Sequence, residues 1–121
     1  MNKNLEKFNE IVDSFKNYID NWNSYGAKPI SDKLAKDSKS ILEKLIENDL
    51  IPSGLYPTDE SIIFEFKINS NRNILELYED DDVVLVLKDD IDKYYDFNLT
   101  DIITAIEILK NHIELRIKRN K

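Results

Sequence analysis

The feature that most constrains the fold of this chain is a change in hydrophobic periodicity near residue 60. Before that point, apolar residues recur at steps of three and four, which lines them up along one side of a helix. After it, apolar and polar residues alternate, which is typical of a strand with one buried face. We therefore predict the α+β class, with helices first and a sheet after them.

Two helices are predicted in the first half. The first spans about residues 4–22, and its apolar side consists of Leu5, Phe8, Ile11, Val12, Phe15, Tyr18, Ile19 and Trp22. Gly26 and Pro29 then interrupt the pattern. Ser31 is the predicted N-cap of a second helix that ends near Asn48. Residues 49–60, which contain two prolines and a glycine, are predicted to be a loop.

Three strands with short connections follow, at about residues 62–68, 72–78 and 83–87, and predict an antiparallel meander. The last of them consists only of valine and leucine, which favours a central or doubly covered strand. Residues 89–97 fit either a fourth, edge strand or an irregular crossover. Asn98 is predicted to cap a final helix. The predicted order is ααβββ(β)α, with residues 1–121 as one domain.

The composition of the chain excludes several classes of site and of function. The chain has no cysteine, which excludes disulfides, thiolate zinc sites and cysteine nucleophiles. It begins without an apolar signal sequence and contains no run of about 20 apolar residues, so we expect a soluble, cytoplasmic protein without membrane contact. The net charge is −7, and residues 61–110 carry 12 acidic but only 5 basic groups. Such a surface repels nucleic acid, and it favours either a basic protein partner or simply solubility.

Two acidic clusters stand at the two ends of the third predicted strand. The first is Glu79, Asp80, Asp81 and Asp82, and the second is Asp89, Asp90, Asp92 and Asp96. The first lacks the spacing of a calcium loop, and about 20 Å of strand separates the two clusters, so they do not share one ion. Each cluster is either a solvated turn or part of an acidic face on which a basic protein docks.

The sequence contains few residues that could support catalysis. His112 is the only histidine, and no second ligand or orienting carboxylate accompanies it, so we expect it at the boundary of the surface. No nucleophile motif or glycine-rich phosphate loop is present. Glu65 and Glu76, if opposed across the first hairpin, are the best carboxylate pair, but 24 acidic residues produce such pairs by chance. We expect no enzyme, no cofactor and no metal.

The segment that joins the two predicted helices is the most distinctive. Trp22 and Tyr25 stand beside a constrained turn, where they either form a binding hot spot or close the end of the first helix. With Gly26, Ala27, Pro29 and Ser31, and with the later Pro57-Thr58 and Ile62–Phe66, this segment resembles the signature of a widespread family of small bacterial proteins. The chain departs from that signature at Asp59-Glu60 and at Phe66.

The resemblance implies a small α+β domain that is often encoded among mobile-element or defence genes, and it implies no catalytic residue. Our leading hypothesis is a non-enzymatic module that inhibits or regulates a protein partner, of the antitoxin, immunity-protein or phage-encoded defence-inhibitor type. The alternative is a structural module that forms a homodimer through its C-terminal helix, whose isoleucines at 102, 103, 106, 108, 113 and 117 cover more than one face.

Overall fold

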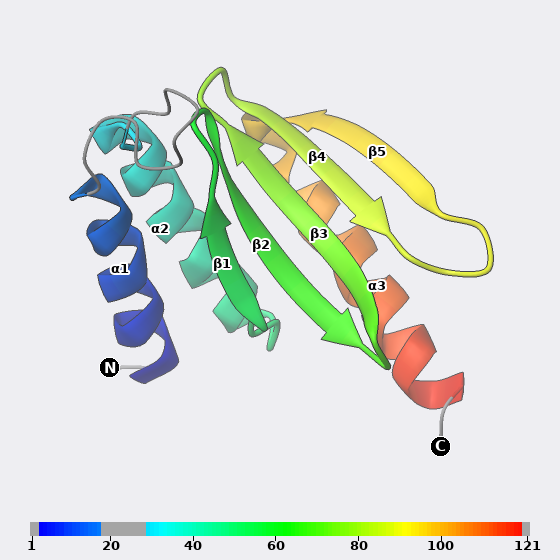
Figure 1. The fold of residues 1–121 in the computed structure, drawn as a ribbon. Coiled ribbons are helices and arrows are strands. Elements are labelled where there is room, and N and C mark those ends of the chain that lie inside the picture. Colours follow the sequence, from blue (N-terminus) through cyan, green and yellow to red (C-terminus); the bar gives the residue numbers. More distant parts are fainter. Residues whose placement is uncertain (1–2, 18–28, 120–121) are drawn as a thin grey trace.

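The computed structural model describes residues 3–17 and 29–119. The chain begins with α1 (Lys3–Lys16) and α2 (Asp32–Glu47), continues through five strands, and ends with α3 (Ile102–Arg119) after a short 3-10 turn at Leu99–Asp101. The strands are β1 (Gly54–Pro57), β2 (Ser61–Ile68), β3 (Asn71–Tyr78), β4 (Asp82–Leu87) and β5 (Lys93–Asn98). Each strand pairs antiparallel with the next, so the sheet order is β1-β2-β3-β4-β5 and the predicted α+β class is confirmed (Figure 1).

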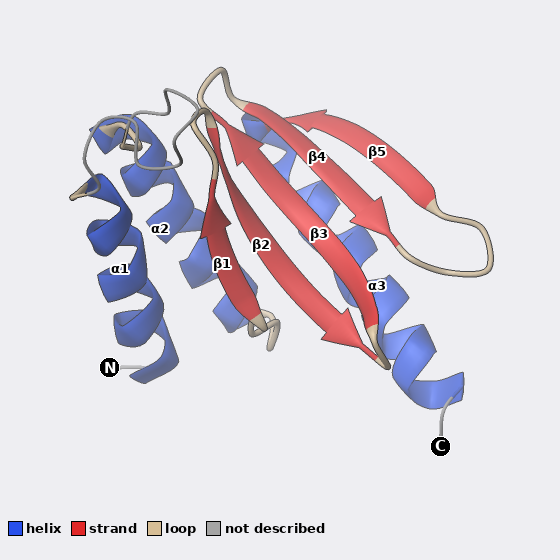
Figure 2. Ribbon diagram, in the orientation of Figure 1, coloured by secondary structure: helices blue, strands red, loops and turns tan. Residues whose placement is uncertain are grey.

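The described helices lie against one face of the sheet, and α3 runs behind the strands in the view of Figures 1 and 2. The inward side chains of the central strands are fully buried, among them Phe64, Leu75 and Leu85. The helices contribute the other half of the core through residues such as Leu42 and Leu109. Whereas α2 and α3 contact the central strands, α1 packs mainly on α2 and meets the sheet chiefly at β1. None of the described helices is long and apolar enough to cross a membrane.

The predicted start of the second helix is confirmed. Ser31 has extended backbone angles, and its hydroxyl accepts a hydrogen bond from the Leu34 N–H at 3.0 Å. The same hydroxyl donates to Glu79 Oε2 at 2.9 Å, which ties the helix to the turn between β3 and β4. Ser31 therefore satisfies an orphan helix donor and also joins the first half of the chain to the second.

Three expectations about the elements need correction or completion. The predicted loop at residues 49–60 contains β1, because Gly54–Pro57 pair with Ile62–Glu65 and Pro57 falls at the end of the strand. Of the two alternatives for residues 89–97, the edge strand is present as β5. The valine-rich strand β4 has neighbours on both sides but alternates between buried and half-buried residues, so it is not covered on both faces. Residues 18–22 of the first predicted helix lie outside the described residues.

Two tight turns contain left-handed residues. Between β2 and β3, Asn69 and Ser70 have φ angles of 52° and 73°, as a type I′ hairpin requires. Between β3 and β4, the Asp81 N–H donates to the Tyr78 carbonyl at 3.1 Å and Asp81 has a φ of 71°. The acidic run of residues 79–82 is thus a hairpin turn, and Asp80 stabilises it by accepting the Asp82 N–H at 3.0 Å.

Candidate docking face

The outward side of the sheet, which we call the open face, has no described helix over it (Figure 1). Its middle is apolar. Cross-strand pairing places Ile74, Val86 and Tyr94 in one row, and Ile63 and Val84 in the adjacent row on either side of Glu76. The four aliphatic residues are half-buried, and Tyr94 is 70% exposed. A soluble monomer has little reason to present contiguous β-branched residues to water, which makes the face a candidate contact surface.

The open face is acidic at one end. Glu76, Val84 and Asp96 lie in one row across β3, β4 and β5, and Asp82 precedes Val84 on the same side of β4. The Asp82 and Asp96 carboxyls are close enough for a hydrogen bond with Asp96 to raise the pKa of Asp82, and burial and the negative charges of Asp96 and Asp80 raise it further. No basic side chain among the described residues pairs with either carboxyl. This pair would be stabilised by a cation from outside the chain.

Glu76 is held in place at the acidic end by hydroxyl groups. The Ser61 hydroxyl donates to Glu76 Oε2 at 2.5 Å and lies 2.6 Å from the Thr58 hydroxyl. Burial and the neighbouring Glu76 carboxylate raise the pKa of Tyr78. These contacts fix the orientation of Glu76, and no ion pair with a basic side chain is found for it among residues 3–17 and 29–119.

The other end of the open face is basic, and its charges are partly satisfied within the chain. Lys67 and Arg72 are cross-strand partners, and the Arg72 Nε lies 2.5 Å from Glu65 Oε2. Glu65 is buried although it belongs to the outward row, because Arg72 covers one side of it. On its other side, Gly54 pairs with Glu65, and the Tyr56 hydroxyl lies 2.8 Å from where a Cβ on residue 54 would stand. The glycine leaves room for the tyrosine ring beside Glu65.

The structure divides the first predicted acidic cluster. Glu79 binds Ser31 at the start of α2, and Asp81 forms an ion pair with Lys33, whose pKa it raises together with Asp37. These two residues therefore have structural partners. The Asp80 carboxylate accepts a hydrogen bond from the Asp82 N–H within the turn. Of these four residues, Asp82 alone has its side chain on the open face.

The second cluster is divided in the same way. Asp89 pairs with Arg116 of α3 at 2.5 Å, and Asp92 pairs with Lys88 at 2.6 Å. Asp90 is exposed in the turn between β4 and β5, and Asp96 lies on the open face. Of the eight acidic residues that the sequence nominated, Asp82 and Asp96 are thus the two that the fold brings together.

The other nominated residues have different outcomes. Trp22 and Tyr25 lie outside the described residues. Glu65 and Glu76 are not directly opposed as suggested, since Glu65 faces Ile74 and Glu76 faces Ile63. His112 is half-buried, its Nε2 lies 3.1 Å from the Lys88 carbonyl oxygen, and burial lowers its pKa. Within residues 3–17 and 29–119, no group of three or more His, Cys, Asp or Glu side chains could hold a metal ion.

Sequence reasoning missed the apolar part of the open face. The signal was present, because Ile63, Ile74, Val84 and Val86 stand at the positions that alternate with the buried residues of their strands. A strand with polar residues at these positions has a solvated outer face, whereas these strands have aliphatic residues on both sides.

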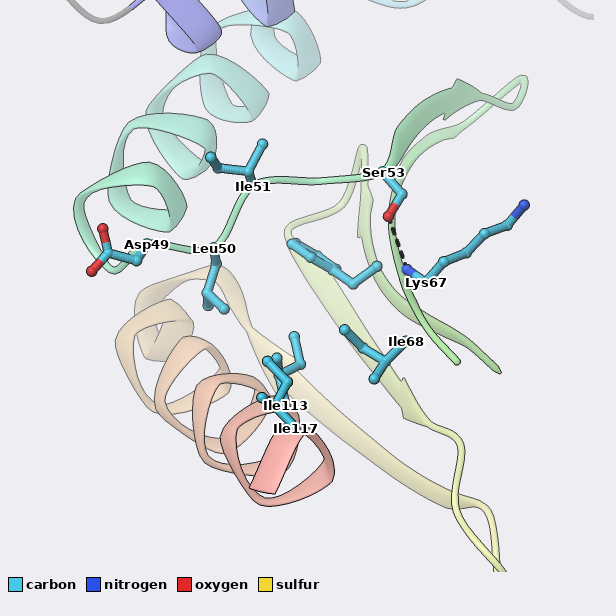
Figure 3. Close-up of a pocket in the computed structure, with 9 residues that line it drawn as sticks. Asp49, Leu50, Ile51, Ser53, Lys67, Ile68, Ile113 and Ile117 are labelled. Carbon is cyan, nitrogen blue, oxygen red and sulfur yellow. Dashed lines mark hydrogen bonds between the residues drawn. The ribbon is translucent and has the colours of Figure 1, made fainter. Parts of the chain in front are cut away.

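A concave feature, separate from the open face, lies beside the C-terminal ends of α2 and α3. The loop after α2, the end of β2 and the C-terminal part of α3 enclose an open cavity of about 230 Å³, lined by Asp49, Leu50, Ile51, Ser53, Phe66, Lys67, Ile68, Ile113 and Ile117 (Figure 3). The lining is mainly aliphatic, and the Lys67 side chain leads away from the isoleucines. Ile51 and Ile117 are 51% and 45% exposed. The groove fits an aliphatic side chain.

Comparison with known proteins adds no identification: no family model, curated protein or solved structure matches the chain. The resemblance of residues 22–31 and 57–66 to a bacterial family therefore stays a prediction.

Proposed function

We propose that this protein is a non-enzymatic binding module that inhibits or regulates a basic protein partner, and that the open face is its docking surface. The observation that supports this most directly is the Asp82–Asp96 carboxyl pair beside half-buried aliphatic residues, on a sheet face that no described helix covers. An apolar patch bordered by charge is the usual composition of a protein contact surface. An arginine or lysine of the partner would neutralise the two carboxyls, and the aliphatic rows would supply the buried contact area.

Affinity capture from the native host with three immobilised proteins tests the proposal. These are the wild type, the face variant Asp82→Asn/Asp96→Asn, and the control Glu107→Gln/Glu114→Gln, which removes the same charge from exposed positions of α3. We expect a partner that the wild type and the control retain, that the face variant loses, and that elutes as salt is raised. Equal recovery on all three proteins would contradict the proposal.

The mode of action is tested with the recovered partner. A protein that inhibits by binding reaches full inhibition only when it is present at a one-to-one ratio with its partner. Inhibition that is complete at a small fraction of the partner's concentration would instead indicate catalysis.

A second candidate function is self-association through α3. Ile103 and Ile117 are 50% and 45% exposed on that helix, and Ile117 borders the apolar groove, which could receive an aliphatic side chain of a second copy (Figure 3). Sedimentation velocity over a range of concentrations tests it. This candidate requires a dimer that Ile117→Glu dissociates, and a wild type that stays monomeric at the highest concentration would exclude it.

A further inference from the structure

The two edges of the sheet differ in how well they are protected. Strand β1 has four residues, contains Gly54 and Pro57, and contacts α1. Strand β5 has six residues, Lys93–Asn98, with neither proline nor glycine, and no described strand pairs with its outer side (Figure 1). Natural sheets usually protect a free edge by shortening it, covering it or placing proline in it. β1 shows all three of these features, whereas β5, whose charged residues are Lys93 and Asp96, shows none of them within the described part of the chain.

The hydrogen-bond phase of β5 identifies the backbone groups at the free edge. The Leu99 N–H donates to the Asp81 carbonyl at 2.8 Å, in register with the β4–β5 pairing. Residues of an antiparallel pair alternate between directing their backbone groups toward the partner strand and away from it. Lys93, Tyr95 and Phe97 therefore face β4. Tyr94 and Asp96 direct their N–H and C=O groups outward.

We propose that β5 accepts an extended segment of the partner as a sixth strand, and that basic and apolar residues alternate in this segment. The inference rests on the proposed function and specifies how the partner binds. On the open face, the incoming strand would lie beside Asp96, where a basic residue pairs across the strands. On the inner face it would lie beside Tyr95 and Phe97, whose rings stack at 6.1 Å and are half-buried. An apolar residue would cover their exposed edges.

Charge disfavours a second copy of β5 as the occupant. Two β5 strands paired about a two-fold axis keep the same face outward, so in the registers that pair most of the strand Asp96 would stand opposite Tyr94 or Asp96 of the other copy. Both arrangements bring two Asp82–Asp96 pairs together on one face, in a chain whose net charge is already −7. Like charges across a strand pair destabilise it, whereas a basic segment removes the repulsion.

The probe is a labelled ten-residue peptide of alternating lysine and valine, with a glutamate–valine peptide as its control. Fluorescence anisotropy measures binding to the wild type, Tyr94→Pro and Tyr94→Ala. Both variants remove the ring, but only proline removes an outward N–H, and it leaves the ladder to β4 intact. We expect binding of the lysine peptide at least tenfold weaker for Tyr94→Pro than for Tyr94→Ala, and little binding of the glutamate peptide. Circular dichroism confirms that both variants are folded.

Hydrogen exchange provides the second measurement. The lysine peptide should slow exchange of the Tyr94 and Asp96 amides in the wild type. Equal affinity of the two variants, or no protection of these amides, would overturn strand addition. If strand addition is overturned but Asp82→Asn/Asp96→Asn still weakens capture of the natural partner, the proposed function stands without strand addition. A wild-type dimer that Tyr94→Pro dissociates would instead identify a second copy as the occupant.

Discussion

Replacing Arg72 by methionine should destabilise the protein, because it leaves a buried carboxylate without its cation. The Glu65 side chain is 3% exposed, and the Arg72 Nε is 2.5 Å from its Oε2. Methionine keeps the length of the arginine stem and its contact with the strand, so the variant removes the charge and the hydrogen bond and little else.

The expected loss of unfolding free energy follows from how exposed the Glu65 and Arg72 side chains are. Breaking a fully buried ion pair costs about 3–5 kcal/mol, whereas an exposed pair contributes at most about 1 kcal/mol. Here the acid is buried and Arg72 is 52% exposed, so we expect a loss of about 2 kcal/mol. For a chain of 121 residues, that loss lowers the unfolding temperature by about 8 °C. Urea unfolding at pH 7 measures the free energy directly.

Two further variants separate the pair from its surroundings. Lys67 lies 3.8 Å from Glu65 Oε1 and is 58% exposed, so Lys67→Met should cost less than about 0.5 kcal/mol. Adding Glu65→Gln to Arg72→Met should recover about 1 kcal/mol, because a neutral amide is easier to bury than a carboxylate. If Arg72→Met is as stable as the wild type, then water or Lys67 compensates Glu65 and the account of the buried pair is wrong.

Three other predictions concern local features. Ser70→Gly should stabilise the protein by about 0.5 kcal/mol in urea unfolding, since glycine adopts a φ of 73° without strain; a loss would contradict the type I′ turn. Asp82→Asn should stabilise by about 0.5 kcal/mol at pH 7, with the gain vanishing below about pH 3.8, where the unfolded-state carboxyl is protonated; a loss at pH 7 would contradict the repulsion. Because burial holds the pKa of His112 below 6.5, the unfolded chain binds more protons near that pH, so the free energy of unfolding should fall as pH is lowered through 6.5. His112→Gln should flatten this slope, and an unchanged slope would place its origin elsewhere.

The helices and the three central strands could be predicted because their apolar residues follow a single period along the element or form a continuous valine and leucine run. Strand β1 could not, since four residues with a glycine and a proline read as a loop until β2 pairs with them. Its strand character depends on Ile62–Glu65, which follow it in the sequence, and no local pattern contains that information.

The candidate docking face was predictable only in part. Charge counting located the acidic segments, but not which carboxylates would find partners. Lys33 and Arg116 neutralise Asp81 and Asp89 across long stretches of sequence, and Ser31 binds Glu79 in the same way. The juxtaposition of Asp82 with Asp96 depends on the register of β4 against β5, which the ambiguity of residues 89–97 left undetermined.

Stability alone does not account for the composition of the open face. If its role were solubility, polar residues at Ile74 and Val86 would serve better, and separating Asp82 from Asp96 would remove a repulsion. If its role were packing, a helix would cover it as α3 covers the other side. Aliphatic rows beside a carboxyl pair that no described basic side chain compensates are unfavourable in the isolated chain and favourable under a basic, partly apolar partner. Asp82→Asn distinguishes the stability of the chain from its binding of a partner, because the substitution should raise stability while it weakens binding. That combination is expected where a residue is kept for function at a cost in stability.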